Sequence, residues 1–216
     1  MLHRTPRKPE RPILWIVAGP NGSGKSTFYN RTDIEGWGGS VWIINPDLLS
    51  LQIEQRESGP AARANAQALD RIMAWLDASI DAYQTIGVET VLSSPKYRPL
   101  VERARARGFE IRMIYVLLES ADLQLERVRI RVEEGGHAVP PDKIVARRTR
   151  SFEQLAWFCA NIDRGWIFDN STSEPKFLAD ILPDGRVLLW NDLPVDLTDA
   201  LTQANVPLWV ASLDRD

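Results

Sequence analysis

The chain has 216 residues, of which 44% are hydrophobic and 25% charged, and its formal net charge is −3 at pH 7. This length allows one domain with a full core and a lid, and the small negative charge argues against a general affinity for nucleic acid or anionic membranes. Cys159 is the only cysteine, so no intramolecular disulfide can form, and no apolar stretch approaches a membrane span. We therefore expect a soluble, cytoplasmic protein with no membrane partner, and we expect Cys159 to lie in the core.

The first predicted elements surround a glycine-rich run. Residues 1–12 are basic, lack the apolar core of a signal peptide and are expected to form a flexible leader. A buried strand is predicted for residues 13–18, and a helix can begin at the end of the run. The run itself fits the phosphate-binding pattern Gly-x4-Gly-Lys-[Ser/Thr] without a mismatch. Its residues are Gly19, Pro20, Asn21, Gly22, Ser23, Gly24, Lys25, Ser26 and Thr27.

This run has the residue types that polyphosphate binding requires. Its glycines let successive backbone N–H groups curl around a polyphosphate, and a following helix N-terminus adds positive charge. Lys25 would reach the β- and γ-phosphates of ATP, and the Ser26 hydroxyl would ligate Mg²⁺. The alternative is a glycine-rich turn that binds nothing, but the complete pattern between strand and helix favours a phosphate-binding loop.

Strand and helix signals alternate along the rest of the chain. Further strands are predicted over 41–44, 88–92 and 166–168 and within 109–118, and helices from 46, around 69–80, over 95–107 and over 120–134. A Gly-Gly break at 135–141 precedes another arginine-bearing helix, a hairpin turn is predicted at 183–185, and a weak helix with a tail follows from 194. This alternation predicts an α/β fold with a mainly parallel sheet, covered on both faces, and ligands at the carboxyl ends of its strands.

Two predicted strands end in carboxylates. Asp47 follows the second strand, where it could orient an acceptor hydroxyl and take its proton, or could stabilise the first turn of its helix. Glu89 and Thr90 lie in the third strand, where a charge is costly to bury unless it is paired. Glu89 could therefore accept hydrogen bonds from substrate hydroxyls, or could occupy an edge or partly solvated position.

Arginines flank the Gly-Gly break. Arg127 and Arg131 share a helix face, and Arg147 and Arg148 follow the break. A kinase needs cations that close over the transferring phosphoryl group, and the planar guanidinium suits this. The alternative is a solvated helix whose arginines pair with neighbouring glutamates.

Five segments between about Ile13 and Ser171 together carry a family resemblance. They are the loop at 19–27, Asn45-Pro46-Asp47, Glu89-Thr90-x-Leu92-Ser93, Arg127-Val128-x-x-Arg131-Val132-x-x-Gly135-Gly136-His137-x-Val139-Pro140, and Asp169-Asn170-Ser171. In this order they resemble the zeta-toxin group, more narrowly the bacterial branch often labelled predicted ABC-type ATPase or kinase.

This resemblance implies a P-loop kinase-like three-layer fold with a helical lid and ATP-dependent phosphorylation of a sugar hydroxyl. In the best-known zeta toxins the substrate is a UDP-N-acetylated amino sugar. The expected domains are the leader at 1–12, a P-loop kinase domain at 13–193 with its lid at about 120–150, and a tail at 194–216. No segment resembles the antitoxin helices, so any antitoxin is expected to be a separate chain.

The resemblance also implies roles for individual residues. Lys25 binds phosphate, and Asp47 is the base. Glu89, Thr90 and Ser93 belong to the substrate side. Arg131 and Arg147 stabilise the transferred phosphate.

Two other functions remain open at this stage. A nucleotide hydrolase or switch would act through a protein partner, but an ABC ATPase would need a Leu-Ser-Gly-Gly-Gln-type signature, whereas Leu92-Ser93 continues as Ser94-Pro95. A kinase acting on nucleic-acid ends would need a basic groove, and only the leader and the lid are basic, so nucleic acid is not the expected substrate.

Overall fold

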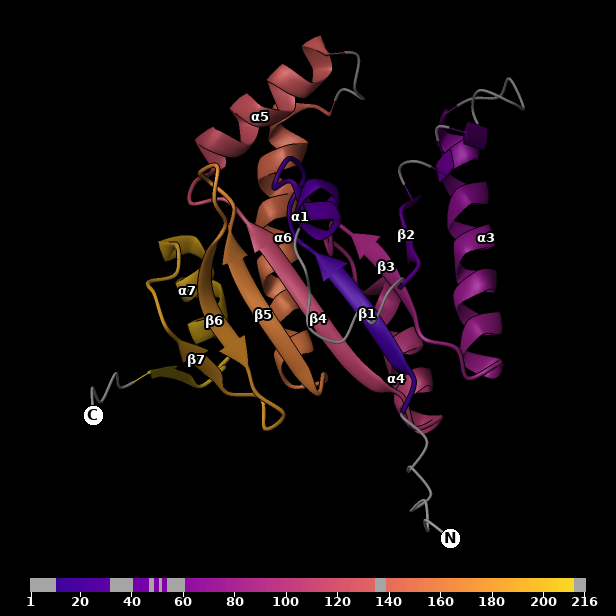
Figure 1. Cartoon of the computed structure of the whole chain (residues 1–216). Coiled ribbons are helices and arrows are strands. Elements are labelled where there is room, and N and C mark those ends of the chain that lie inside the picture. The colour runs from indigo at the N-terminus through magenta and orange to yellow at the C-terminus, as the bar shows by residue number, and fades with distance from the viewer. Residues whose placement is uncertain are drawn as a thin grey trace, which may run out of the picture.

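A computed structural model of the chain describes residues 11–31, 41–46, 49–50, 52–53, 61–134 and 139–211. The described part forms one eight-stranded sheet with helices packed on it (Figure 1). The strands are β1 Ile13–Ala18, β2 Ile43–Ile44, β3 Ile86–Thr90, β4 Glu110–Leu117, β5 Arg164–Asp169, β6 Lys176–Ile181, β7 Val187–Leu189 and β8 Leu208–Val210. The helices are α1 Lys25–Arg31, α3 Ala61–Asp81, α4 Arg98–Ala106, α5 Ala121–Glu133, α6 Pro141–Cys159 and α7 Val195–Gln203, and a 3₁₀ turn, η1, spans Pro95–Tyr97.

The strand order places several strand ends at one site. The order is β2-β3-β1-β4-β5-β6-β7-β8; the first five strands are parallel to one another, and β6 is antiparallel to β5. Ala18 at the end of β1 pairs with Thr90 of β3 on one side and Tyr115 of β4 on the other. The loops that follow β1, β3, β4 and β5 therefore leave the same edge of the sheet, which is where α/β folds bind ligands.

Both faces of the sheet carry a core, as the alternating sequence pattern predicts. On one face, buried residues of α3, α4, α6 and α7 pack against β1, β3, β4 and β5. On the other face, Trp15, Ile114 and Val116 pack with Phe28 of α1. Figure 1 shows α5 standing over the tips of the parallel strands. The predicted mainly parallel α/β fold is confirmed.

The C-terminal residues take part in this fold. The segment expected to be a tail contains α7, whose Leu197 and Leu201 are fully buried, and β8, which pairs in parallel with β7. The hairpin predicted at residues 183–185 joins β6 to β7, with Gly185 at φ 84°. The second strand is shorter than predicted, because only Ile43–Ile44 pairs with β3. Among the described residues, no helix combines the length and apolarity needed to cross a bilayer.

Candidate active site

The predicted phosphate loop connects β1 to α1, and its glycines are required by space as well as by backbone angle. Gly19 and Gly24 have φ values of 144° and 81°, which L side chains rarely adopt. A Cβ on Gly19 would lie 1.9 Å from the Val116 carbonyl oxygen, and a Cβ on Gly24 would lie 2.5 Å from Asn170 Nδ2. The backbone of the loop therefore packs closely against β4 on one side and against the residues after β5 on the other, which leaves no room for a side chain at Gly19 or Gly24.

Lys25 lies over this loop. Its Nζ donates hydrogen bonds to the carbonyl oxygens of Gly19 at 2.9 Å and Pro20 at 3.1 Å, and its side chain is buried. A buried ammonium group at the mouth of a glycine-rich turn attracts an anion strongly, because little water screens it. Lys25 therefore lies where a polyphosphate on the loop would meet it.

Glu89 lies beside the loop as a buried, paired carboxylate. It is 8% exposed, and its Oε2 accepts hydrogen bonds from Ser26 Oγ at 2.8 Å, Asn45 Nδ2 at 2.9 Å and Tyr29 Oη at 3.1 Å. Burial and the negative charge of Glu89 raise the pKa of Tyr29 to about 12, so its phenol remains a donor. These three hydrogen bonds, rather than water, stabilise the negative charge of Glu89 within β3. They also hold the Glu89 carboxylate against the Ser26 hydroxyl.

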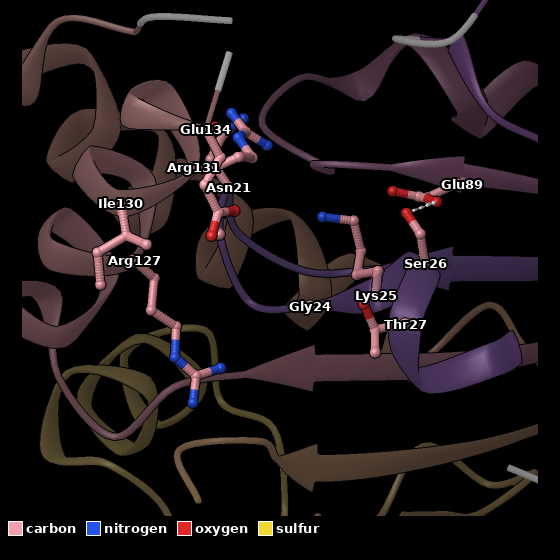
Figure 2. Close-up of a pocket in the computed structure, with 11 residues that line it drawn as sticks. Asn21, Gly24, Lys25, Ser26, Thr27, Glu89, Arg127, Ile130, Arg131 and Glu134 are labelled. Carbon is pink, nitrogen blue, oxygen red and sulfur yellow. Dashed lines mark hydrogen bonds between the residues drawn. The ribbon is translucent and has the colours of Figure 1, made fainter. Parts of the chain in front are cut away.

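A cavity of about 330 Å³ opens between the phosphate loop and α5. Figure 2 shows the α5 side chains on one side of it and Ser26 with Glu89 on the other. The lining from the loop and α1 includes Asn21, Gly22, Gly24, Lys25, Ser26 and Thr27, and the lining from α5 includes Arg127, Ile130 and Arg131. Arg131 thus faces the same space as the phosphate loop, as the sequence prediction requires.

A second cavity, of about 200 Å³, lies on the β3 side of the loop. It shares Lys25 and Glu89 with the first cavity, so the two spaces meet at these side chains. The other side chains around it are mainly polar or cationic. They include Asn45, Thr90, Ser93, Ser94, Lys96 and Arg147. The structure therefore brings Thr90, Ser93 and Arg147 together in a space separate from the one that holds Arg131.

The residues after β5 support the phosphate loop, a role that the sequence analysis did not assign. Asn170 Nδ2 donates to the Ser23 carbonyl oxygen at 2.8 Å, and the backbone N–H of Asn170 donates to Leu117 at 2.9 Å. The carbonyl oxygen of Ser171 accepts from Arg127 Nη2 at 2.9 Å. These contacts connect the loop, β4 and the arginine helix α5. The sequence signal for these contacts was the polar run Asp169-Asn170-Ser171, which directly follows the strand predicted over 166–168.

The two adjacent arginines of α6 have different environments. Arg148 is 2% exposed and donates to both carboxylate oxygens of Asp196, at 2.6 and 3.1 Å, and to the Leu118 carbonyl oxygen at 2.9 Å. Arg147 lines the second cavity. Arg148 therefore joins α6 to α7, and Arg147 is the arginine of this pair that faces the site.

The predicted solvated arginine also exists on α5. Arg129 is exposed and pairs with Glu126 at 2.6 Å and with Glu133.

Three predicted features lie outside the described residues: Asp47, the Gly135-Gly136 break and His137. Cys159 is buried, as predicted, and burial raises the pKa of its thiol to about 12. In the part of the chain that the structure describes, no group of three His, Cys, Asp or Glu side chains could hold a metal ion.

Comparison with known proteins adds a family and a fold. A protein of Haemophilus influenzae, described as uncharacterized, is 24% identical over 146 residues, which cover 63% of this chain and 98% of that protein. A chain from the structure of the PezAT chromosomal toxin-antitoxin system of Streptococcus pneumoniae superposes with a TM-score of 0.63 at 18% identity, covering 94% of this chain and 82% of that one.

A chain of the AvrRxo1-ORF1:-ORF2 structure with ATP gives a TM-score of 0.62 at 18% identity, covering 95% of this chain and 66% of that one. A chain from Chloroflexus aurantiacus, assigned as a kinase in its structure, shares this fold with a TM-score of 0.54 at 16% identity, covering 94% of this chain and 86% of that one. The predicted resemblance to the zeta-toxin group and the predicted P-loop kinase class are thus confirmed at the level of fold.

The sequence itself matches the family AAA_33, described as an AAA domain, over residues 14–155. This match begins in β1, runs through the phosphate loop and both cavities, and ends in α6 after Arg147. Because it covers well over half of the chain, the protein belongs to this AAA domain family.

Proposed function

We propose that this protein transfers the γ-phosphate of ATP to a hydroxyl group of a small acceptor. The acceptor we propose is a sugar nucleotide, such as a UDP-N-acetyl amino sugar. The observation that carries the proposal is the pair of cavities that meet at Lys25 and Glu89. One cavity is lined by the phosphate loop, and the other lies on the β3 side of the loop and is lined mainly by polar and cationic side chains.

On the nucleotide side, the chain binds and neutralises phosphate. Backbone N–H groups of the loop cradle the polyphosphate, and Lys25 moves its donor bonds from Gly19 and Pro20 to phosphate oxygens. Arg131 approaches from α5 and offsets charge on the transferring group. Asn170 keeps the loop in shape through its bond to Ser23.

The residues near Ser26 fit a magnesium ion bound together with ATP. Ser26 Oγ and Glu89 Oε2 lie 2.8 Å apart, and both are oxygen atoms of the kind that ligate Mg²⁺. In proteins Mg²⁺ is usually held by one or two protein oxygens together with substrate phosphates and water. When bound, Mg²⁺ would neutralise charge on the β- and γ-phosphates. The bonds from Tyr29 and Asn45 hold the Glu89 carboxylate toward Ser26.

On the acceptor side, Thr90 and Ser93 offer hydroxyl groups to the acceptor, and the Arg147 guanidinium offsets charge on the transferring phosphoryl group from that side. In our proposal the acceptor oxygen forms a bond to the γ-phosphorus while the bond from that phosphorus to the β–γ bridging oxygen breaks. The hydroxyl proton passes to the carboxylate of Asp47, and ADP leaves with the bridging oxygen. In this scheme Glu89 holds Ser26 near the magnesium position through their hydrogen bond. This role differs from the resemblance to zeta toxins, which implies that Glu89 contacts the substrate.

The main alternative is a nucleotide hydrolase or switch that acts through a protein partner. A hydrolase needs room only for water beside the γ-phosphate, whereas the second cavity provides about 200 Å³ lined by polar side chains. That space favours transfer to an acceptor. We further propose that an antitoxin, if the chain has one, is a separate protein, since the PezAT and AvrRxo1 structures are two-component assemblies.

A direct experiment is to incubate the protein with ATP, Mg²⁺ and a panel of UDP-sugars and nucleosides, and to search by mass spectrometry for one added phosphoryl group. The Lys25→Ala variant is the matched control. We expect one class of acceptor to gain phosphate with the wild-type protein only. ADP formation with no phosphorylated acceptor across the panel would argue for the hydrolase.

A further inference from the structure

The turn that follows β3 contains a strained residue. Leu92 has a φ of 57°, in the left-handed region that bulky side chains rarely adopt. Its side chain is 1% exposed and belongs to the core on the α6 face of the sheet, and its backbone N–H donates to Thr90 Oγ1 at 2.9 Å. The turn lines the second cavity, which the proposed reaction makes the acceptor cavity. Such strain persists only where the surroundings hold it, and it is concentrated at functional sites.

Helix α6 holds this turn through a buried hydroxyl. Ser151 Oγ donates to the carbonyl oxygen of Val91 at 2.7 Å and lies 2.6 Å from Tyr115 Oη of β4. Because a carbonyl oxygen can only accept, the single Ser151 proton is used on Val91, and Tyr115 must be the donor to Ser151. Burial raises the pKa of Tyr115, so its phenol remains protonated. The two hydrogen bonds form a chain from β4 through α6 to the turn, and bonds in such a buried chain strengthen one another.

The same face of α6 carries Arg147. Arg147 and Ser151 are four residues apart in this helix, so they are neighbours one turn apart on its surface. Arg147 lines the acceptor cavity, and so does Ser93 from the turn. The bond from Ser151 to Val91 joins the helix to the turn within one helical turn of Arg147. It therefore fixes where the Arg147 guanidinium lies relative to the Ser93 hydroxyl.

The nucleotide side has supports of its own. The carbonyl oxygen of Thr90 accepts from the backbone N–H of Gly19 at 3.2 Å, which joins the end of β3 to the phosphate loop. Asn170 Nδ2 donates to the Ser23 carbonyl oxygen from the opposite side of the loop. Neither of these bonds involves Ser151. Loss of the Ser151 bond should therefore disturb the acceptor cavity and leave the ATP site in place.

We propose that Ser151 is a positioning residue for the acceptor. Supported by Tyr115, it holds the strained Leu92 turn against α6, so that the Ser93 hydroxyl and the Arg147 guanidinium keep one arrangement around the reacting hydroxyl. The inference rests on the proposed kinase function and adds two residues to it. Ser151 and Tyr115 are fully buried, so they act through residues that line the cavity. Their effect can be large, because a misplacement of about 1 Å by a distant mutation can lower a rate by about 10²-fold.

Four variants test this role. Ser151→Ala removes the bond to Val91 and leaves the Tyr115 hydroxyl without its acceptor, whereas Ser151→Thr keeps a hydroxyl. Ser151→Ala combined with Tyr115→Phe removes the stranded phenol as well but does not restore the bond to Val91. Arg148→Ala is the stability control, because Arg148 is a buried residue of the same helix whose three hydrogen bonds lie outside this chain.

Four quantities are measured for each variant, at a temperature where all of them are folded. They are Tm, ATP affinity by calorimetry, kcat/KM for the phosphorylated acceptor at saturating ATP, and hydrogen exchange of the backbone amides in residues 90–94. The acceptor is the one that the panel of UDP-sugars and nucleosides identifies. Hydrogen exchange reports on the turn independently of activity, because opening of the turn exposes the Leu92 amide.

We expect Ser151→Ala to lower Tm by about 2–8 °C, to speed exchange of the Leu92 amide by roughly 3- to 10-fold and to lower acceptor kcat/KM by roughly 10- to 100-fold. ATP affinity should change less than about twofold. Ser151→Thr should recover most of the kcat/KM. The double variant should regain part of the Tm but none of the kcat/KM, and Arg148→Ala should lose Tm but keep kcat/KM. If Ser151→Ala does not fold, the double variant replaces it, because it leaves no stranded phenol.

The outcomes distinguish this inference from the kinase proposal. Wild-type transfer with a normal kcat/KM in Ser151→Ala, or an equal loss in Arg148→Ala, would overturn the positioning role and leave the kinase proposal standing. Recovery of kcat/KM together with Tm in the double variant would do the same, since it would show a role in stability alone. A wild-type protein that phosphorylates no acceptor of the panel would reject the kinase proposal for these acceptors, and with it any role of Ser151 in their transfer.

Discussion

Arg147 and Arg148 are adjacent in α6, and the structure predicts opposite results when each is replaced by alanine. Arg148→Ala removes two hydrogen bonds to Asp196, one to Leu118 and a contact 4.7 Å from the Phe152 ring centroid. Breaking a buried ion pair typically costs 3–5 kcal/mol, but the Asp196 side chain is 50% exposed and regains water. We therefore expect a loss of about 2–3 kcal/mol in the free energy of unfolding.

In a chain of this length each kcal/mol lowers Tm by about 2–4 °C, so Arg148→Ala should lower Tm by about 4–12 °C. At a temperature where it is folded, this variant should bind ATP and transfer phosphate like the wild type. Arg147→Ala should change Tm by less than about 2 °C, because Arg147 is only partly buried and lines a cavity, and substitutions outside the core usually cost under about 0.5 kcal/mol. Its transfer rate should fall by roughly 10³-fold, the lower end for an arginine that stabilises a transferring phosphate.

The assay is thermal unfolding by circular dichroism beside the initial rate of phosphate transfer, with both variants at equal concentration. Arg147→Lys should recover little activity, because lysine lacks the planar, two-pronged donor set. The reasoning would be refuted if Arg148→Ala unfolded within about 2 °C of the wild type, or if Arg147→Ala transferred phosphate normally.

Four further outcomes are expected. Lys25→Ala should abolish turnover with little change in Tm, because it removes the point charge on the β- and γ-phosphates; normal ATP turnover would contradict this. Asp47→Asn should leave ATP affinity nearly unchanged and lower transfer by about 10²–10⁴-fold, whereas a helix-capping role predicts near-normal turnover and a stability loss of at most about 1 kcal/mol. Asn170→Ala should weaken ATP binding by about 2- to 10-fold through loss of its bond to Ser23, as measured by calorimetry; unchanged affinity would remove it from the support of the loop. The Cys159 thiol should not react with a maleimide at pH 8 until the protein unfolds, because burial raises its pKa to about 12. For the same reason the free energy of unfolding should fall as pH rises above about 8.5, where the thiol loses its proton in the unfolded chain but not in the folded protein.

The phosphate loop could be predicted because its requirements are local. Positive φ at Gly19 and Gly24, a lysine and a hydroxyl at fixed spacing are all properties of one short segment. The strand before the loop and the helix after it are equally local. The roles of Arg147 and Arg148 could not be assigned in this way, because adjacent helix residues face different directions and the partner of Arg148, Asp196, is distant in sequence.

The contacts of Glu89 and Asn170 depend on how strands are ordered in the sheet. The sequence indicates that Glu89 lies in an apolar strand and needs a partner, but only the adjacency of β3 and β1 brings it to Ser26. Asn170 reaches Ser23 because the end of β5 lies near the phosphate loop. The sequence indicates a weak helix from residue 194, where α7 lies, but β8 escaped the prediction because it has three residues, and a short strand gives a weak periodic signal.

The most direct test of the central claim is the fate of the γ-phosphate. ATP radiolabelled in that phosphate is incubated with the protein, Mg²⁺ and one acceptor at a time, and the label in the acceptor is compared with the label in inorganic phosphate. A kinase of the proposed kind predicts acceptor-dependent ADP formation, with most of the label in the acceptor and none there for Lys25→Ala. Label that appears only as inorganic phosphate, at a rate independent of every acceptor, would contradict phosphoryl transfer and leave a nucleotide hydrolase.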